Sequence, residues 1–466
     1  MDVTGKKVIV VGLARSGVGA ANLLHQLGAS VTVTDKKKPE ELGPYIEELQ
    51  PGILYSLGGH PVELFEAADL IVVSPGVPLS IAPLKAASEK GITIIGELEL
   101  AYLSAGSHKT TFLAITGTNG KSTTTSLLNS MLKKGGFSTL LGGNIGNSLT
   151  LALVEMNGGP MQFPDFIVAE VSSFQLDTVH AFKPHVAAIL NITPDHLDRY
   201  RSMSDYIDSK CRIFLNQDHL DFIVLNADDP MNVEVLKRTG SHLPQKERNH
   251  GGPQIFYFSR KREVTGAYYK NGVIYFSLPG LSSFTLNPSA FKIKGVHNIE
   301  NAMAASLMAL LSGCESGAVA DALAEFPGLE HRLEFVREMD GITFINDSKG
   351  TNVGAVVKSL ESFDRPIVLI AGGRDKDGDF TGLKPFIRDK VKALVLIGEA
   401  RDKIKKAVGD STEIFMGNSL GEAVAKAKEL ASPGDVVMLS PACASFDMFR
   451  DFEHRGRQFK ELVGNL

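Results

Sequence analysis

The feature that most constrains the fold is a repeated pattern: a short run of β-branched residues, then a turn, then a stretch with helical spacing. The pattern occurs in three groups along the chain, which begin with KVIVVG, FLAITG and ITFINDSKG. Strands that alternate with helices form parallel sheets, because each helix returns the chain to the edge where the strands begin. We therefore predict an α/β protein with three parallel sheets.

Two breaks separate these groups, at SAGSHK near residue 104 and at FPGLEHR near residue 328. A chain of 466 residues exceeds what one hydrophobic core usually supports, so we expect several domains. The breaks predict domains at 1–103, 104–328 and 329–466. Residues 254–294 depart from the pattern, and we interpret them as a small excursion of antiparallel strands within the central domain. Asn271 and Gly272 predict a hairpin turn there.

Composition excludes several classes of function. The net charge is −5, and Lys and Arg form no concentrated stripe, so we expect no nucleic-acid binding. No run of about 20 apolar residues is present to span a membrane, and the N-terminal MDVTGKKVIVVG lacks the long apolar core of a secretory signal. The three cysteines are far apart, which is typical of a reducing compartment. These observations together predict a cytoplasmic protein. We also expect a monomer, since no long apolar face is left unaccounted for.

Residues 112–123, FLAITGTNGKST, nearly match the phosphate-binding pattern G-x-x-x-x-G-K-[ST], but Ile115 replaces the first glycine. In such a loop the backbone N–H groups and the start of the next helix hold phosphate. Lys121 would contact the β- and γ-phosphates, and Ser122 or Thr123 would bind Mg²⁺. A glycine turn without a ligand is the alternative. The predicted ATP-binding residues of the loop are Gly117, Thr118, Asn119, Gly120, Lys121, Ser122 and Thr123.

Two further strands of the central group end in residues suited to a metal. Glu170 ends FIVAE, and His196 follows AAILNI. Open α/β sheets bind ligands at the carboxyl ends of their strands, so we predict that both residues face the loop. Taken singly, an exposed glutamate or an ordinary histidine would explain each. Lys210 follows on a helix, where an exposed lysine is the default interpretation.

Other polar clusters lie farther along the chain. Asn298 and Asn301 share one face of a helix, which capping and packing would explain equally well. EHRLEFV and INDSKGTNVGA contain Arg332, Asp347, Ser348, Lys349 and Thr351. AGGRDKDGDF ends a strand with two glycines, and its basic side chains, among them Lys376, suit an acidic ligand.

The N-terminal VVGLARSGVGAA resembles the dinucleotide-binding pattern G-x-G-x-x-G, with Gly12 and Gly17 in place. Asp35 ends the second strand, where a ribose-binding acid is expected. A dinucleotide-dependent oxidoreductase or a nucleotide sensor is therefore one alternative. Ala14 would hold a pyrophosphate away from the backbone, and no catalytic pair accompanies the motif, so both observations argue against that alternative.

Taken together, the motifs resemble those of the Mur ligase family, the ATP-dependent enzymes that build the peptide of peptidoglycan. The resemblance runs over essentially the whole chain, through GTNGKST, EVSSFQLD, NITPDHLDRY, GVHNIENAMAA, EHRLEF, NDSKGTN, IAGGRDKDGDF and SPACASFDMFRDFEHRG. The family's loop lacks the leading glycine, so Ile115 fits it. The resemblance implies Rossmann-like N- and C-terminal domains and a P-loop ATPase-like central domain that contains the β excursion.

The resemblance also implies a reaction. GLARSG, GELEL and SPACASFDMF are similar to the motifs of the member that adds D-glutamate to UDP-N-acetylmuramoyl-L-alanine through an acyl phosphate. It implies ATP, two Mg²⁺ ions and CO₂ as cofactors, with CO₂ carried as a carbamate on Lys210. Mur ligases that add L-alanine, a diamino acid or a dipeptide remain alternatives, as does a folylpolyglutamate synthetase.

The resemblance finally implies roles for individual residues. The residues nearest the chemistry would be Lys121, His196 and Lys210. The metal ligands would be Ser122, Glu170, His196 and Lys210. The contacts to adenosine and its phosphates would be Asn298, Asn301, Arg332 and Asp347. The D-glutamate pocket would contain Thr351, Lys376, Ser445, Phe446 and Phe452. The uridine diphosphate and sugar contacts would be Ser16, Asp35, Ser74, Pro75, Gly76 and Asn144. Arg15 and Arg374 depart from the family pattern.

Overall fold

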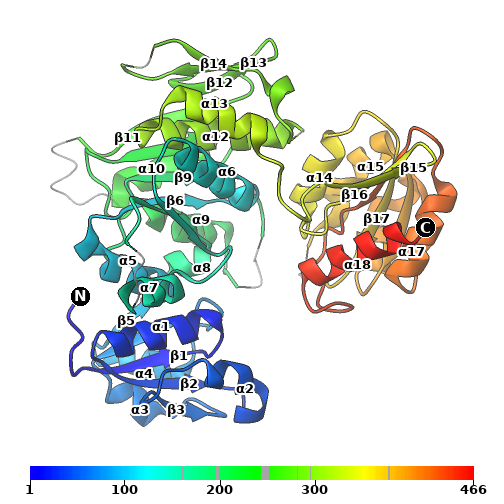
Figure 1. Cartoon of the computed structure of the whole chain (residues 1–466). Coiled ribbons are helices and arrows are strands. Elements are labelled where there is room, and N and C mark those ends of the chain that lie inside the picture. Colours follow the sequence, from blue (N-terminus) through cyan, green and yellow to red (C-terminus); the bar gives the residue numbers. More distant parts are fainter. Residues whose placement is uncertain (159–161, 196–198, 243–250, 281, 294, 376–377) are drawn as a thin grey trace.

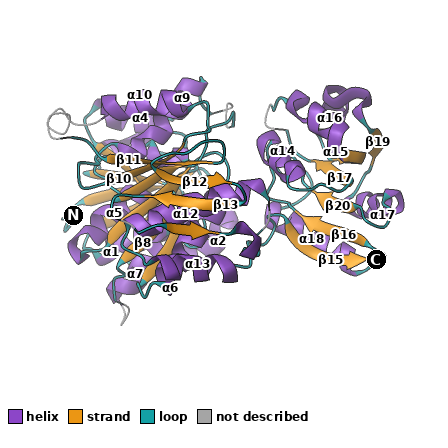
Figure 2. Ribbon diagram, turned by 90° about the horizontal axis from the view of Figure 1, so that it is seen from above, coloured by secondary structure: helices purple, strands orange, loops and turns teal. Residues whose placement is uncertain are grey.

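A computed structural model describes residues 1–158, 162–195, 199–242, 251–280, 282–293, 295–375 and 378–466. The chain forms three blocks, each built on one sheet flanked by helices (Figure 1). The third block stands beside the central one, and helices cover its sheet from both sides (Figure 2). Within the described residues, no helix is long and apolar enough to cross a membrane.

The first sheet is parallel throughout and has the order β3-β2-β1-β4-β5. Its strands are β1 (Lys7–Val11), β2 (Ser30–Asp35), β3 (Leu54–Leu57), β4 (Leu70–Val73) and β5 (Thr93–Gly96). Its helices are α1 (Arg15–Gln26), α2 (Pro39–Glu47), α3 (Val62–Glu66) and α4 (Ala82–Glu89). The strand order reverses between β1 and β4, which is where open α/β sheets place a ligand crevice.

Helix α5 (Glu97–Ala105) leads from the first block into the central one and is fixed by two buried glutamates. Glu97 Oε1 accepts hydrogen bonds from Thr150 N at 2.9 Å and Thr150 Oγ1 at 3.0 Å. The Glu99 carboxylate accepts three, from the backbone N–H groups of His180, Ala181 and Phe182 at 3.0, 2.6 and 3.0 Å. One hydrophobic cluster also runs from α1 through α5 into α7 (Leu149–Gly158) and the central sheet. The first and central blocks therefore share a core.

The central sheet has the order β14-β13-β12-β11-β10-β9-β6-β8-β7. Its strands are β6 (Thr111–Thr116), β7 (Thr139–Gly143), β8 (Phe166–Glu170), β9 (Val186–Ile189), β10 (Phe222–Asn226), β11 (Gln254–Ser259), β12 (Gly266–Lys270), β13 (Val273–Ser277) and β14 (Phe284–Leu286). The further helices are α6 (Lys121–Lys134), α8 (Ser173–Leu176), α9 (Met203–Cys211), α10 (Asn232–His242), α12 (Val296–Leu311) and α13 (Ser316–Glu325). Short 3-10 turns occupy Gly106–His108, Arg212–Phe214 and Pro288–Ala290.

The predicted β excursion extends the edge of the central sheet. The hairpin is confirmed: β12 and β13 pair antiparallel, and Asn271 and Gly272 have φ values of 50° and 84°. The antiparallel prediction is wrong for β11, which runs parallel to β10 and to β12. Helix α10 returns the chain to the starting edge before β11, and such a crossover makes the two strands parallel. Residues 291–293 form no strand.

The third sheet has the order β15-β16-β20-β17-β18-β19 and is parallel except for β15. Its strands are β15 (Glu334–Met339), β16 (Ile342–Asn346), β17 (Ile367–Gly372), β18 (Val391–Ile397), β19 (Glu413–Met416) and β20 (Val436–Leu439). Its helices are α14 (Val353–Glu361), α15 (Lys384–Lys390), α16 (Arg401–Val408), α17 (Leu420–Leu430) and α18 (Phe452–Gly464), with 3-10 turns at Phe380–Leu383 and Gly409–Ser411. Two hydrophobic clusters on its faces form this block's own core.

Candidate functional site

The loop between β6 and α6 has the geometry of an anion cradle. Gly117 and Gly120 have φ values of 147° and 85°, and Gly120 directly precedes the first residue of α6. A Cβ atom at Gly117 would lie 3.1 Å from Leu190 Cβ and 3.3 Å from Asn191 N. Glycine therefore meets both the backbone conformation and the close packing that the loop requires. The loop ends at the N-terminus of a 14-residue helix, where N–H groups favour phosphate.

Asn191, at the end of β9, holds the loop in place. Its Oδ1 accepts from Asn119 N at 2.8 Å, its Nδ2 donates to Asn119 O at 3.0 Å, and its backbone O accepts from Thr118 N at 2.9 Å. In the sequence, Asn191 stands out only as a polar residue at the end of a strand, where it begins the NITPDHLDRY motif, and no role in the site was predicted for it.

Two lysines converge on this loop. Lys121 Nζ donates to the backbone oxygens of Gly117 and Thr118, both at 2.9 Å, and Lys210 Nζ donates to Gly117 O at 3.1 Å. Burial lowers the pKa of Lys121, while the charge of Glu170 opposes that shift. Burial and the charge of Lys121 hold the pKa of Lys210 well below its usual value. Lys210 is 2% exposed, so its interpretation as an exposed helical lysine is wrong.

Glu170 projects from the end of β8 toward the same loop and is also buried, at 2% exposure. Its Oε1 accepts from Asn144 Nδ2 at 2.7 Å. Its Oε2 is buried without a hydrogen-bond partner among the residues that the structure describes. An unpartnered buried carboxylate oxygen is costly, and a cation would satisfy it. His196, predicted to share this site, lies outside the described residues.

The predicted asparagine pair on α12 lies beside the loop and is buried. Asn301 Oδ1 accepts from Thr124 Oγ1 at 3.2 Å, and Asn301 Nδ2 donates to Asn298 Oδ1 at 3.1 Å. A Cβ atom at Gly120 would collide with Asn301 Oδ1. The structure thus brings this helix face against the start of α6.

Arg332 reaches the loop from the start of the third block. Its NH2 group donates to Ser122 Oγ at 2.8 Å. Burial lowers the pKa of Arg332, and the charges of Glu170 and Asp347 oppose this. Asp347 follows β16, and its Oδ2 accepts from Ser359 Oγ and Ser440 Oγ, both at 2.6 Å. Burial raises the pKa of Asp347, so these hydroxyl groups stabilise a carboxylate in a desolvated position.

The predicted D-glutamate set is only partly assembled by the described residues. Thr351 and Phe452 are half-buried, Ser445 is 2% exposed, and Phe446 is 63% exposed. Lys376 lies outside the described residues. Lys349, which the prediction omitted, places Nζ 3.5 Å from the centroid of the Phe452 ring.

Lys349 adds positive charge to this end of the third sheet. Burial and the charge of Arg332 lower its pKa to about 8. The sequence signal for Lys349 was its place in the NDSKGTN motif, beside Asp347.

In the first block, two predicted residues hold the turn after β1. Ser74 Oγ donates to Gly12 O at 3.0 Å. Asp35 Oδ2 accepts from Leu13 N at 2.7 Å, and its Oδ1 accepts from Lys37 N at 2.9 Å. Ser16 lies at the start of α1, beside this turn. Ser74 and Pro75 also line a narrow pocket at the seam with the central block, together with Gln175 and Arg199.

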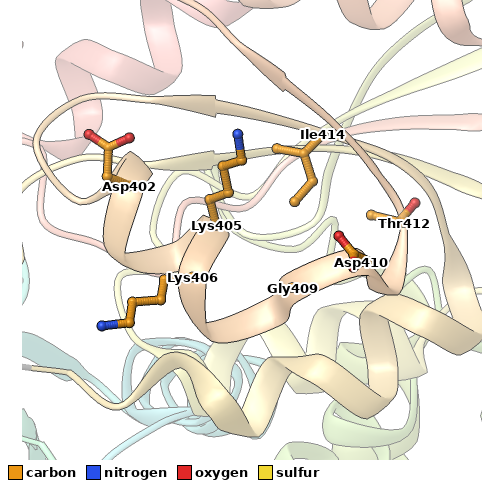
Figure 3. A pocket seen from close by; sticks show the side chains of 7 residues that line it. All are labelled: Asp402, Lys405, Lys406, Gly409, Asp410, Thr412 and Ile414. Atoms are coloured by element: carbon orange, nitrogen blue, oxygen red, sulfur yellow. The ribbon is translucent and has the colours of Figure 1, made fainter.

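Two other features lie apart from this site. A surface concavity of about 500 Å³ is lined by seven residues of the α16–β19 region, none of them predicted (Figure 3): Asp402, Lys405, Lys406, Gly409, Asp410, Thr412 and Ile414. Glu330, His331 and Glu334 place possible metal-ligand atoms within 4.8 Å of one another. Lys460 Nζ already bonds both glutamates, at 2.5 and 2.8 Å, so the cluster is explained as an ion-pair network.

Comparison with known families identifies three matching regions. Residues 6–96 match the family described as Mur ligase MurD-like, N-terminal domain; residues 115–309 match Mur ligase middle domain; and residues 331–443 match Mur ligase, glutamate ligase domain. A UDP-N-acetylmuramoylalanine--D-glutamate ligase from Geotalea uraniireducens is 46% identical over 469 residues, covering 100% of this chain and 99% of that protein. The ligase of the same name from Pelotomaculum thermopropionicum is 45% identical, with the same coverage.

Solved structures share the fold. A pseudomurein peptide ligase type C from Methanothermus fervidus is 20% identical, with a TM-score of 0.61, and the match covers 99% of this chain and 100% of that one. A UDP-N-acetylmuramate-alanine ligase from Thermotoga maritima is 20% identical, with a TM-score of 0.59 and 99% coverage of both chains. At this identity the likeness concerns the three-block architecture alone.

Proposed function

This chain belongs to the Mur ligase family, and on that premise we propose that it joins D-glutamate to UDP-N-acetylmuramoyl-L-alanine, with conversion of ATP to ADP and phosphate. The observation that carries the proposal is 46% identity, over the full length of the chain, to a ligase named for this reaction. The convergence of Lys121, Lys210 and Glu170 on a glycine-rich loop supports the ATP-dependent part.

We assign one part of the reaction to each block. Residues 1–103 bind the uridine diphosphate end of the acceptor, with Ser16, Asp35, Ser74, Pro75 and Gly76 at the turns that follow β1, β2 and β4. Residues 104–328 bind ATP and the sugar-peptide, the latter with the help of Asn144. Residues 329–466 bind D-glutamate. The reversal of strand order between β1 and β4 supports the first of these assignments, because a ligand crevice is expected beside the turns that follow those two strands.

In the first step, a carboxylate oxygen of L-alanine attacks the γ-phosphorus of ATP. The bond from that phosphorus to the β,γ-bridging oxygen breaks, and its electron pair leaves with ADP, so the product is an acyl phosphate. Both reactants are anions, and their approach requires positive charge. The Lys121 ammonium and the loop N–H groups supply it. We assign the contacts to adenosine and its phosphates to Asn298, Asn301, Arg332 and Asp347.

The residues around Glu170 fit Mg²⁺, because Glu170 Oε2 is buried without a partner among the described residues. Carboxylate and hydroxyl oxygens are the ligands that Mg²⁺ prefers. Ser122, Glu170, His196 and carbamylated Lys210 would hold two ions. When bound, Mg²⁺ neutralises phosphate charge and helps to orient the transferring group.

The surroundings of Lys210 support a carbamate. The lone pair of the amine nitrogen attacks the carbon of CO₂, one C=O π pair moves onto oxygen, and the nitrogen then loses a proton. An ammonium has no lone pair, so only the uncharged amine reacts. Burial and the charge of Lys121 lower the pKa of Lys210 and favour that form. The product would be an anion, at a side chain that is 2% exposed and next to the phosphate loop. It would relieve the repulsion between Lys121 and Lys210.

In the second step, the amine of D-glutamate attacks the acyl carbon. A tetrahedral intermediate forms, phosphate leaves with the electron pair of the carbon–oxygen bond, and the amine loses a proton. Holding the reactants together lowers the barrier, and closure of the third block excludes water from the acyl phosphate. Thr351, Lys376, Ser445, Phe446 and Phe452 form the D-glutamate pocket in this proposal.

Phosphate release tests the proposal. The protein is incubated with ATP, Mg²⁺ and UDP-N-acetylmuramoyl-L-alanine, with D-glutamate, L-glutamate, L-alanine or diaminopimelate added in parallel. We expect release that depends on D-glutamate alone. Release with a different amino acid would keep the ligase reaction and overturn the pocket, whereas no release with any of them would overturn the proposed reaction.

A further inference from the structure

Asn352 lies between the predicted Thr351 and helix α14, and its side chain makes hydrogen bonds within two blocks. Its Oδ1 accepts from Ala355 N at 2.8 Å and caps α14. Its Nδ2 donates into the central block, to Asn119 Oδ1 at 3.2 Å and to Asp195 Oδ2 at 3.3 Å. The side-chain oxygen therefore accepts a hydrogen bond from the helix of its own block, while the NH₂ group donates hydrogen bonds to the central block.

The first acceptor lies within the phosphate loop. Asn119 is the residue immediately before Gly120, and Asn191 of the central block already fixes its backbone. Asn352, from the third block, fixes its side chain. The arrangement of this part of the loop thus depends on the position of α14 as well as on the central sheet.

The second acceptor, Asp195, is one of the charged groups that act on Lys121 and Lys210. Burial lowers the pKa of both Lys121 and Lys210, and the negative charge of Asp195 opposes that effect at both of them. By donating to this carboxylate, Asn352 connects the third block with the groups proposed to meet the γ-phosphate.

Helix α14 contacts the central block at both of its ends. At the first turn, a Cβ atom on Gly354 would lie 3.4 Å from Asn119 Nδ2 and 3.5 Å from Thr193 Oγ1, which is ordinary van der Waals contact with the central block. At the other end, the C-capping residue Ser362 lies with its Oγ 3.1 Å from His297 Nδ1, at the start of α12. The helix is therefore placed to transmit the position of the third block to the phosphate loop.

We propose that Asn352 is a positioning residue for phosphoryl transfer, which sets the phosphate loop through Asn119 and Asp195 when the third block closes on the central one. The inference rests on the proposed function for the reaction that it serves. The Asn352 hydrogen bonds join α14 of the third block to the phosphate loop of the central block, so we expect their loss to lower turnover more than the affinity for nucleotide.

The test distinguishes the helix-capping role of Asn352 from its hydrogen bonds to the central block, which we call the bridge. In Asn352→Asp and Asn352→Ser, a side-chain oxygen still caps α14, because Asp and Ser are good N-cap residues. Neither variant supplies the NH₂ donor, and Asp places a carboxylate against Asp195. The matched control is Ser419→Ala, which removes the cap of α17 in the same block, where Ser419 Oγ accepts from Glu422 N at 3.1 Å. Each variant is measured for kcat, for the Kd of ADP, for thermal stability and, by small-angle scattering, for compaction with ATP analogue and acceptor.

We expect kcat to fall tenfold to a hundredfold in Asn352→Ser, and further in Asn352→Asp, with the Kd of ADP within twofold of wild type and a Tm that matches it. We expect Ser419→Ala to lower Tm and leave kcat unchanged. Wild-type kcat and compaction in Asn352→Ser would overturn the inference, as would losses of kcat that follow Tm in all variants. The scattering measurement uses ATP analogue and acceptor without an amino acid, so it is read separately from the phosphate-release assay. If the wild-type protein released no phosphate with D-glutamate, the proposed reaction would be overturned. A loss of compaction in the Asn352→Asp variant would still support the bridge.

Discussion

Replacement of Glu99 by glutamine tests the junction between the first and central blocks. The carboxylate is 1% exposed and accepts three backbone N–H groups of residues 180–182. Oε2 accepts two of these hydrogen bonds and Oε1 accepts the third, from Ala181 N at 2.6 Å. In glutamine one of the two oxygens becomes an NH₂ group. At that position the NH₂ group would face a backbone N–H group, and no hydrogen bond could form.

The expected loss follows from these contacts. Hydrogen bonds to a charged acceptor contribute about 1.5–3 kcal/mol each and neutral ones about 1 kcal/mol. Three charged bonds at about 2 kcal/mol would be replaced by two neutral ones, so we expect Glu99→Gln to lower the free energy of unfolding by about 4 kcal/mol. For domains of roughly 150–250 residues, this corresponds to a fall in Tm of roughly 10 °C.

Calorimetry and amide hydrogen exchange measure the effect. We expect faster exchange at the amides of residues 180–182 in the variant. Glu97→Gln is the matched control on the same helix. A single oxygen of Glu97 accepts both bonds from Thr150, and an amide oxygen can retain them; the Leu149 N–H and the Ser148 side chain also interact with this carboxylate. Burial also raises the pKa of Glu97 toward its neutral form, so we expect a loss of only about 1 kcal/mol. A Glu99→Gln loss as small as that of the control, with unchanged exchange, would refute the reasoning.

Three further predictions concern Lys210 at the site, His297 at the start of α12 and Gly373 in the third block. Lys210→Ala should lose more than 99% of turnover and regain part of it with added short-chain carboxylates; full activity without them would exclude a carbamate role. Burial and the charge of Lys358 lower the pKa of His297 from 6.5 to about 4, so the unfolded chain binds a proton there that the folded chain does not. Stability should therefore fall by about 2–3 kcal/mol as pH drops from 6.5 to 4, and His297→Gln should flatten that dependence in acid-unfolding curves. Gly373 has a φ of 137°, and a Cβ atom there would collide with Ala444 O, so Gly373→Ala should lower the Tm of the third block by several degrees in calorimetry; an unchanged Tm would show that the turn relaxes.

The sequence predicts the central strands of the three sheets better than their edges. β1, β6 and β17 are apolar runs that the sheets bury almost completely. Four strands, β3, β7, β15 and β19, have no such buried run, and each lies at the edge of its sheet. Their side chains are mostly half-buried or exposed, so selection for burial leaves no apolar run to recognise. The direction of β11 was missed because strand direction follows from the crossover, which residue pattern does not encode.

The candidate site divides in the same way between local and distant information. The loop and Glu170 are predictable because glycine, lysine and carboxylate occupy fixed positions after strands. The burial of Lys210 is not, because it depends on how α9 packs against a loop more than 90 residues earlier, where Gly117 O accepts a hydrogen bond from Lys210 Nζ. Asn352 and Asn191 also act through contacts between distant segments, and an asparagine beside a strand or helix has many local explanations.

The shared core and glutamate anchors of the first and central blocks have a consequence for ligand discovery. A compound that spans these two blocks meets a surface whose two halves are already fixed together, so its affinity is not reduced by the free energy of domain closure. In the proposed mechanism the third block closes on the central one, so a compound that spans these two blocks would have to select the closed arrangement, and its apparent affinity would fall with the population of that arrangement. Fragment screens against the seam beside Ser74 and Gln175 should therefore report intrinsic affinities, whereas screens around Asn352 should report closure as well.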